Sequence, residues 1–112
     1  MNNNVRKAVE AVDHANQIAS RLALADITDA TTNCAVAADN AEFLTAINAA
    51  QLAVEAAMDE VDGAALTELD FAAAAVACAR MHYYRPARTN RKDAAAETQN
   101  AYRRILAGSR QA

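Results

Sequence analysis

The fold is decided by the stretch LDFAAAAVACAR, residues 69–80, in which half of the residues are alanine. Alanine is the strongest helix former, and the stretch contains neither glycine nor proline. The same composition extends outward through all 112 residues, where Gly63, Pro86 and Gly108 are the only helix breakers. The sequence therefore predicts a single all-α domain, residues 1–112, folded as a compact alanine-rich bundle of about four helices.

The abundance of alanine also bears on stability. Hydrophobic residues make up 54% of the chain, but alanine supplies most of them and there is no tryptophan. Alanine buries little area, and apolar burial stabilises a fold by about 25 cal/mol per Å². We therefore expect an isolated monomer to be only marginally stable, which favours an oligomer.

Apolar stripes at three- and four-residue steps predict helices over 4–25, 40–61, 67–84 and 93–107. The expected N-cap residues are Asn3 or Asn4, Asp39, Thr67, and Asn90 or Asp93. Gly63, Pro86 and Gly108 are expected to end helices. Segment 26–39, rich in turn-forming residues, is predicted to be a loop with a short extended stretch at 34–36. The residues predicted for the core are Val54, Met58, Val76 and Ile105.

Positive charge is concentrated in the last third of the chain, although the net charge is only −3. Segment 80–110 carries eight of the eleven basic residues and only two of the fourteen carboxylates. Such polarity can steer association, so that copies meet acidic surface to basic surface. The residues expected at an interface are Arg80, Tyr83, Tyr84, Arg85, Arg88, Arg91, Lys92, Arg103 and Arg104.

The sequence offers little that points to catalysis or to a bound ion. Cys78 and His82 are four residues apart and can share one helix face, but a structural zinc site needs four ligands. Asp59, Glu60 and Asp62 cluster at an expected helix end, without a nucleophile, a glycine-rich phosphate loop or a serine motif. We therefore expect no enzymatic activity, no cofactor and no metal.

The segments of the chain also suggest its compartment. The longest apolar run, 71–79, is far shorter than the ~20 residues needed to span a bilayer. The first residues, MNNN, lack the basic-then-apolar order of a secretory signal. We expect a cytosolic protein with no membrane partner, in which Cys34 and Cys78 are reduced thiols.

The basic segment 85–92, with Tyr83 and Tyr84 beside it, allows a second interpretation. Arginine binds phosphate and tyrosine stacks on bases, as in nucleic-acid-binding proteins. The domain is acidic overall, however, and has no recognition-helix motif. We favour the interpretation that these arginines pair with carboxylates of segment 40–61 or of a neighbouring subunit.

Three stretches in order carry a resemblance to a known family. Residues 39–50, DNAEFLTAINAA, open a helix with an acid and continue with an Ala-Ile-x-x-Ala step. Residues 69–84, LDFAAAAVACARMHYY, form an alanine-rich helix with an aromatic and basic end, and a basic loop then leads to residues 101–108, AYRRILAG. This order resembles the head–tail connector, or adaptor, proteins of tailed bacteriophages. The resemblance covers 39–108 and leaves out 1–38, the predicted N-terminal helix and loop.

The resemblance implies a structural role rather than an enzymatic one. Connector proteins assemble as rings, commonly twelve-fold, beneath the portal protein, where they extend the DNA channel and hold the next neck or tail protein. It therefore implies a virion protein of the neck, present in the host cytoplasm before assembly. DNA would pass through the channel without sequence-specific binding.

Two other function classes stay open. The chain is also compatible with a small phage or bacterial inhibitory or anti-defence protein, whose polarised surface blocks a host protein. It is compatible with a nucleic-acid-binding accessory factor that uses segment 85–92.

Overall fold

The computed structural model describes residues 3–24, 30–83 and 88–111, with side chains for 3–24, 41–81 and 92–111. It contains four α-helices: α1 (Asn3–Leu24), α2 (Ala30–Met58), α3 (Gly63–Tyr83) and α4 (Arg88–Gln111). Over these ranges no strand is present. The prediction of an all-α bundle of about four helices is confirmed.

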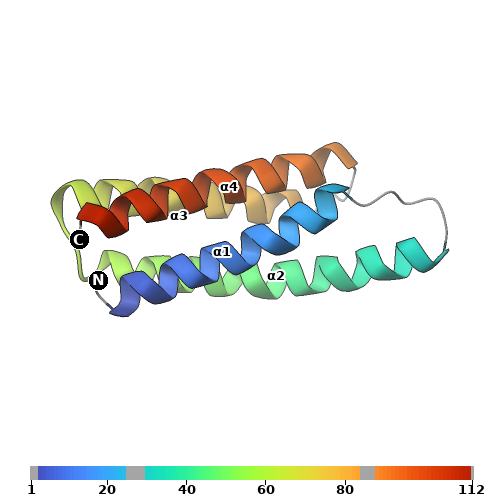
Figure 1. Cartoon of the computed structure of the whole chain (residues 1–112), viewed down its shortest axis with the longest axis horizontal. Coiled ribbons are helices and arrows are strands. Elements are labelled where there is room, and N and C mark those ends of the chain that lie inside the picture. The colour runs from blue at the N-terminus through green and yellow to red at the C-terminus, as the bar shows by residue number, and fades with distance from the viewer. Residues whose placement is uncertain (1–2, 25–29, 84–87, 112) are drawn as a thin grey trace.

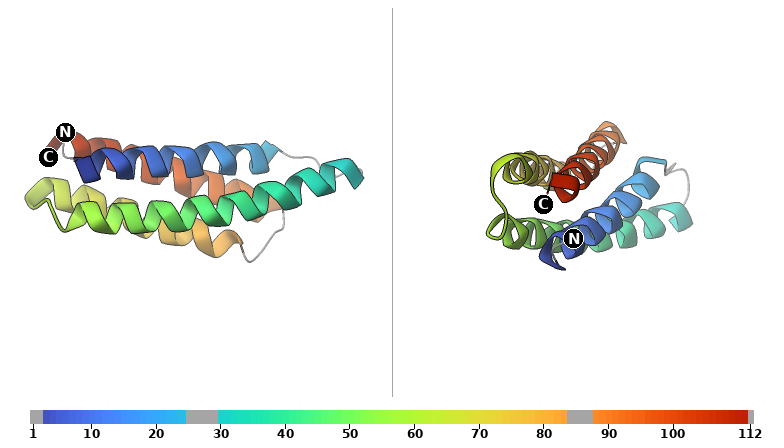
Figure 2. Two further views of the ribbon diagram at one scale, coloured as in Figure 1. Left: turned by 90° about the horizontal axis from the view of Figure 1, so that it is seen from below. Right: turned by 60° about the vertical axis from the view of Figure 1, so that its left-hand side comes forward.

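The helices run alternately up and down, so that each is antiparallel to the next (Figure 1). α1 packs against α2 and α4, and α3 packs against the same two helices, which places α1 and α3 at opposite corners of the bundle (Figure 2). The bundle measures 48 × 21 × 19 Å. The start of α1, the α2–α3 connection and the end of α4 share one end (Figure 1).

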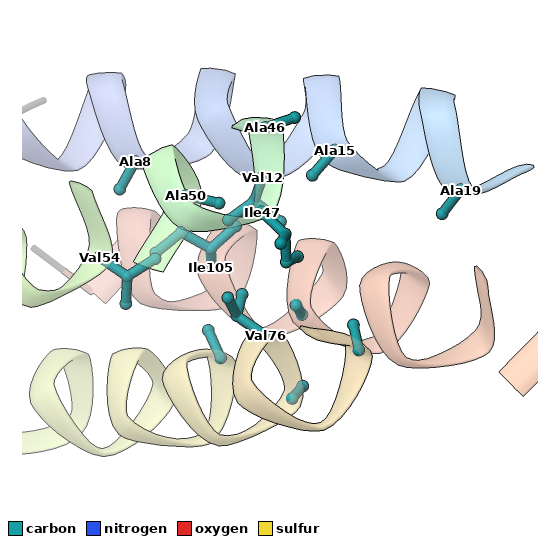
Figure 3. Close-up of a cluster of buried hydrophobic side chains, with 14 of the residues drawn as sticks. Ala8, Val12, Ala15, Ala19, Ala46, Ile47, Ala50, Val54, Val76 and Ile105 are labelled. Carbon is teal, nitrogen blue, oxygen red and sulfur yellow. The ribbon is translucent and has the colours of Figure 1, made fainter. Parts of the chain in front are cut away.

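The core consists of one apolar stripe from each helix. Most buried residues on α1 follow steps of three and four, the spacing that lets antiparallel helices interdigitate, and Ile18 widens the stripe beside Ala19. The buried residues are Val5, Ala8, Val12, Ala15, Ile18, Ala19 and Leu22. Side chains of all four helices meet at the centre, among them Val12, Ile47, Val76 and Ile105 (Figure 3). More than half of the buried apolar residues described are alanines.

The core prediction is confirmed for Val54, Val76 and Ile105, which are fully buried. Met58 is partly buried and packs against the cluster from its edge.

Thr98 is the buried polar residue of the described core, and its hydroxyl has acceptors within reach on its own helix and on α1. The nearest are Ala95 O and Asn16 Oδ1, both at 3.0 Å.

The predicted start of the second helix is wrong. α2 begins at Ala30 rather than near 40, so most of the predicted 26–39 loop, including the extended stretch at 34–36, is helical. The expected cap, Asp39, lies inside α2. Turn-forming residues such as Thr31 and Asn33 cost a helix only a few tenths of a kcal/mol each, and no glycine or proline intervenes. The surrounding alanines therefore carry the helix through.

The boundaries of α3 also differ from the prediction. α2 ends at Met58, and α3 begins at Gly63 rather than at Thr67. Gly63 has the left-handed φ of 59° predicted for it, but it stands at the first position of α3. The Thr67 hydroxyl donates to the Gly63 carbonyl at 3.2 Å, so this side chain bonds back along the first turn instead of capping it.

α4 is longer than predicted at both ends. It begins at Arg88, so the expected caps Asn90 and Asp93 lie within it, and it continues past Gly108 to Gln111. Gly108 is buried where α4 crosses α3, and a Cβ at this position would lie 2.3 Å from Leu69 Cδ1. Glycine therefore favours the close packing of α4 on α3 at this position and does not end the helix.

Candidate interaction surfaces

The predicted interface residues divide into three groups. Tyr84 and Arg85 lie outside the described residues. Tyr83, Arg88 and Arg91 lie on helices, but their side chains also fall outside the description. The positions of the side chains are described for Arg80, Lys92, Arg103 and Arg104.

These residues do not form one basic patch. α4 has 24 residues and is therefore about 36 Å long. Arg88 lies at its start, and Arg104, sixteen residues on, is about 24 Å away along the axis. The last residues of α4 reach the opposite end of the bundle, beside the start of α1 (Figure 1). The charge asymmetry of the sequence is thus spread along the whole length of the molecule.

Arg104 is held within its own chain. Its Nη1 lies 3.3 Å from Glu68 Oε2 on α3, and its guanidinium lies 4.8 Å from the ring centre of Phe71. The neighbouring Arg103 donates to Asn100 Oδ1 at 2.8 Å. A groove of about 310 Å³ runs beside these residues along the α3–α4 seam.

A second ion pair within the chain joins α1 to the acidic helix α2. Arg21 Nη2 lies 3.0 Å from Glu42 Oε2, with both side chains about half exposed. Pairs this exposed contribute roughly 0–1 kcal/mol each. At least one carboxylate of α2, that of Glu42, therefore pairs with a basic residue of α1 and not with the basic segment near the C-terminus.

Arg80 lies on the seam between α2 and α3. Its Nη1 donates to Gln51 Oε1 at 3.3 Å, and Gln51 Nε2 in turn donates to Glu55 Oε1 at 3.3 Å. Two grooves of about 280 and 300 Å³ share Gln51 and Arg80 in their walls. Across the described part of the chain, Arg80 makes no contact with a carboxylate.

The most distinctive surface is one that the predicted interface residues did not include. We name it the outer α3 stripe: Asp70, Ala74, Ala77 and Met81, flanked by Phe71 and Cys78. All six residues are exposed, with Phe71 at 51% and Met81 at 66%. A usable signal was present, because residues 71–79 contain no charge on any side of the helix. An all-round apolar helix is normally covered on all sides.

The candidate chemical groups are dispersed. Cys78 is exposed on α3, and the His82 side chain and Cys34 side chain lie outside the described set. Asp59 and Asp62 are exposed at the α2–α3 connection, and Glu60 accepts a hydrogen bond from Asn4. Over the described ranges, no three His, Cys, Asp or Glu side chains lie close enough to hold a metal ion.

Comparison with known proteins found no matching family model, curated protein or solved structure. In the described helices, no segment combines the length and the apolar character that crossing a membrane requires.

Proposed function

We propose that this protein is a structural assembly subunit and not an enzyme. The observation that carries the proposal is the outer α3 stripe, which leaves Phe71 and Met81 exposed on a helix with few charges. Exposed apolar side chains grouped on one element mark contact sites for other proteins. A core made largely of alanine also provides little area per residue, so covering this stripe adds stabilisation that the monomer lacks.

The particular setting we propose is the neck of a tailed phage. The support is the resemblance of 39–108 to head–tail connector proteins. In this setting the protein forms a ring of copies, commonly twelve, in the virion, between the portal and the next neck or tail protein. The rod-like bundle, 48 Å long and about 20 Å wide, has a shape that can stand side by side in such a ring.

The proposal gives the two ends of the bundle different tasks. Arg88, Arg91 and Lys92 fall in the first turns of α4, at the end opposite the termini. There they can reach a neighbouring subunit or the portal, and a set of exposed charges acts together although each pair is weak. DNA in the channel would meet a net acidic protein, which is unsuited to tight binding.

Electron microscopy of the purified full chain, alone and mixed with a phage portal protein, tests this function. Mixed with the portal protein, the parent is expected to form rings. The double reversal Arg88→Glu/Arg91→Glu is expected to remove them while the protein stays helical by circular dichroism. The matched control Arg6→Glu/Lys7→Glu reverses two exposed charges on α1 and is expected to keep the rings.

Absence of rings from the parent under both conditions would contradict the connector role. DNA binding by fluorescence anisotropy separates the nucleic-acid alternative. A parent that binds DNA tightly at physiological salt, and a double reversal that loses this binding, would replace the connector with an accessory factor.

A further inference from the structure

The outer α3 stripe has the spacing of a helix-packing seam. Asp70, Ala74, Ala77 and Met81 follow steps of four, three and four residues, and they point away from the inner stripe of Leu69, Ala72, Val76 and Ala79. α3 thus has two seams on opposite sides, and α2 and α4 cover only the inner one. The small side chains of Ala74 and Ala77 at the middle of the outer seam allow another helix to approach closely.

A pair of opposite charges brackets this seam. Asp70 lies at one end, and Arg80 lies near the other end on the side of α3 that faces α2, each near five residues along the chain from the midpoint between Ala74 and Ala77. In the part of the chain that is described, Asp70 makes no hydrogen bond or ion pair, and Arg80 makes no ion pair and hydrogen-bonds to the neutral Gln51. Each charge therefore lacks an ionic partner within its own chain, as far as the described residues extend.

We propose that two copies of this chain pair antiparallel through the outer α3 stripe, about a two-fold axis that passes between Ala74 and Ala77. In this arrangement Asp70 lies opposite Met81 of the partner subunit and within reach of Arg80 of the partner subunit. Phe71 lies beside Cys78 of the partner subunit, an apolar contact between sulfur and a ring. A parallel arrangement would instead place Asp70 against its own copy, which like-charge repulsion disfavours.

A second copy is the occupant that the charges favour. The stripe is self-complementary only when reversed, which is the property of a two-fold interface. Apart from Leu24 at the end of α1, the exposed faces of α1 and α4 consist largely of charged and amide residues such as Arg6, Glu10, Gln17, Lys92 and Arg103. The pairing rests on the proposed assembly role, but not on the phage setting.

The contact is small. The stripe covers the twelve residues from Asp70 to Met81, so it is about 18 Å long and one helix wide, or about 180 Å² in projection for each copy. That lies below the roughly 800 Å² per partner of a standard stable interface, so the pair is weak, with a dissociation constant in the micromolar range or above. Head-to-tail contacts in a ring would use other faces, because this one is occupied by its own copy.

Sedimentation equilibrium of the full chain, from about 10 µM to about 1 mM, tests the pairing. The average mass is expected to rise from 11.9 kDa towards twice that value. Ala77→Glu places a charge at the centre of the seam and is expected to keep the mass at that of the monomer. The matched control Ala96→Glu, at an exposed position on α4, is expected to pair like the parent.

A charge swap tests the direction of pairing. Asp70→Arg and Arg80→Glu alone should each weaken pairing by about tenfold or more, because each sets like charges together. The double variant Asp70→Arg/Arg80→Glu should restore it to within about threefold of the parent. Alkylation of Cys78, followed by peptide mass spectrometry, should slow as the parent concentration rises and should not slow for Ala77→Glu.

A parent that stays monomeric throughout the range overturns the pairing, as does an Ala77→Glu variant that pairs normally. Failure of the double variant to recover, when Ala77→Glu has dissociated, overturns the antiparallel geometry. Circular dichroism confirms that each variant is folded. Rings without pairs would support the proposed function and overturn the pairing. Pairs without rings or portal binding would support the pairing and overturn the proposed connector function.

Discussion

Gly108→Ala tests the close packing of α3 and α4. The added methyl group would lie 2.3 Å from Leu69 Cδ1, 3.3 Å from Glu68 Cβ and 3.4 Å from the Ala65 carbonyl oxygen. Carbon atoms in favourable contact lie about 3.5–4.0 Å apart, so the first contact cannot persist. Leu69 is fully buried in the core cluster, so a shift of its side chain also disturbs its core neighbours.

Two opposing effects decide whether Gly108→Ala raises or lowers the free energy of unfolding. Alanine inside a helix is about 1 kcal/mol more favourable than glycine. Overpacking a well-filled core costs about 1–3 kcal/mol. We expect overpacking to exceed the gain in propensity, with a net loss of about 1 kcal/mol in the free energy of unfolding. For a domain of this size that corresponds to a fall in Tm of about 4 °C.

Thermal unfolding followed by circular dichroism, at one fixed protein concentration, measures this loss. Leu69→Val removes the carbon atom that the new methyl meets and supplies the control. In that background Gly108→Ala should be neutral or should stabilise by up to about 1 kcal/mol, because only helix propensity then acts. A higher Tm for Gly108→Ala in the parent would refute the close approach and leave propensity as the dominant effect.

Three further substitutions test the core, a turn and a surface contact. Val54→Asp should prevent folding, because an unpaired carboxylate at this fully buried site costs several kcal/mol; a melting curve like the parent's would contradict it. Gly63→Ala should cost about 1–2 kcal/mol through its left-handed φ alone, since no atom lies near the added carbon, and Gly63→Asn should cost less in the same urea titration. Arg104→Ala removes the contacts with Glu68 and Phe71 but should lower stability by only about 1 kcal/mol, and this loss should shrink at high salt; a loss of several kcal/mol would show that the contact is stronger than its exposure suggests.

The helices and the core could be predicted because they depend on a local pattern. Val54, Val76 and Ile105 lie on stripes with a helical period, and a period repeated over several turns is a strong signal. The fold class needed only that pattern and the scarcity of breakers. The boundaries were less predictable, because cap residues such as Asp39 and Thr67 occur inside helices at little cost.

The wrong prediction for Gly108 and the missed outer α3 stripe have a different origin. Gly108 has the sequence context of a helix end, and only the position of Leu69 on another helix reveals that the missing side chain makes room. The outer α3 stripe was hidden because alanines lie on every side of that helix, so periodicity could not tell the inner side from the outer one. The expected interface residues Arg88 and Arg104 lie about 24 Å apart along α4, because a helix rises by about 1.5 Å per residue.

The two seams of α3 connect the composition of the chain to its proposed role. On the inner seam, alanines such as Ala72 and Ala79 let α4 approach closely, and Gly108 completes that contact. On the outer seam, Ala74 and Ala77 have the same size but face solvent. Charge placed on the inner seam is expected to unfold the domain, whereas charge placed on the outer seam is expected to leave the fold intact and to act on the proposed association. Folding and assembly can therefore be separated residue by residue on a single helix.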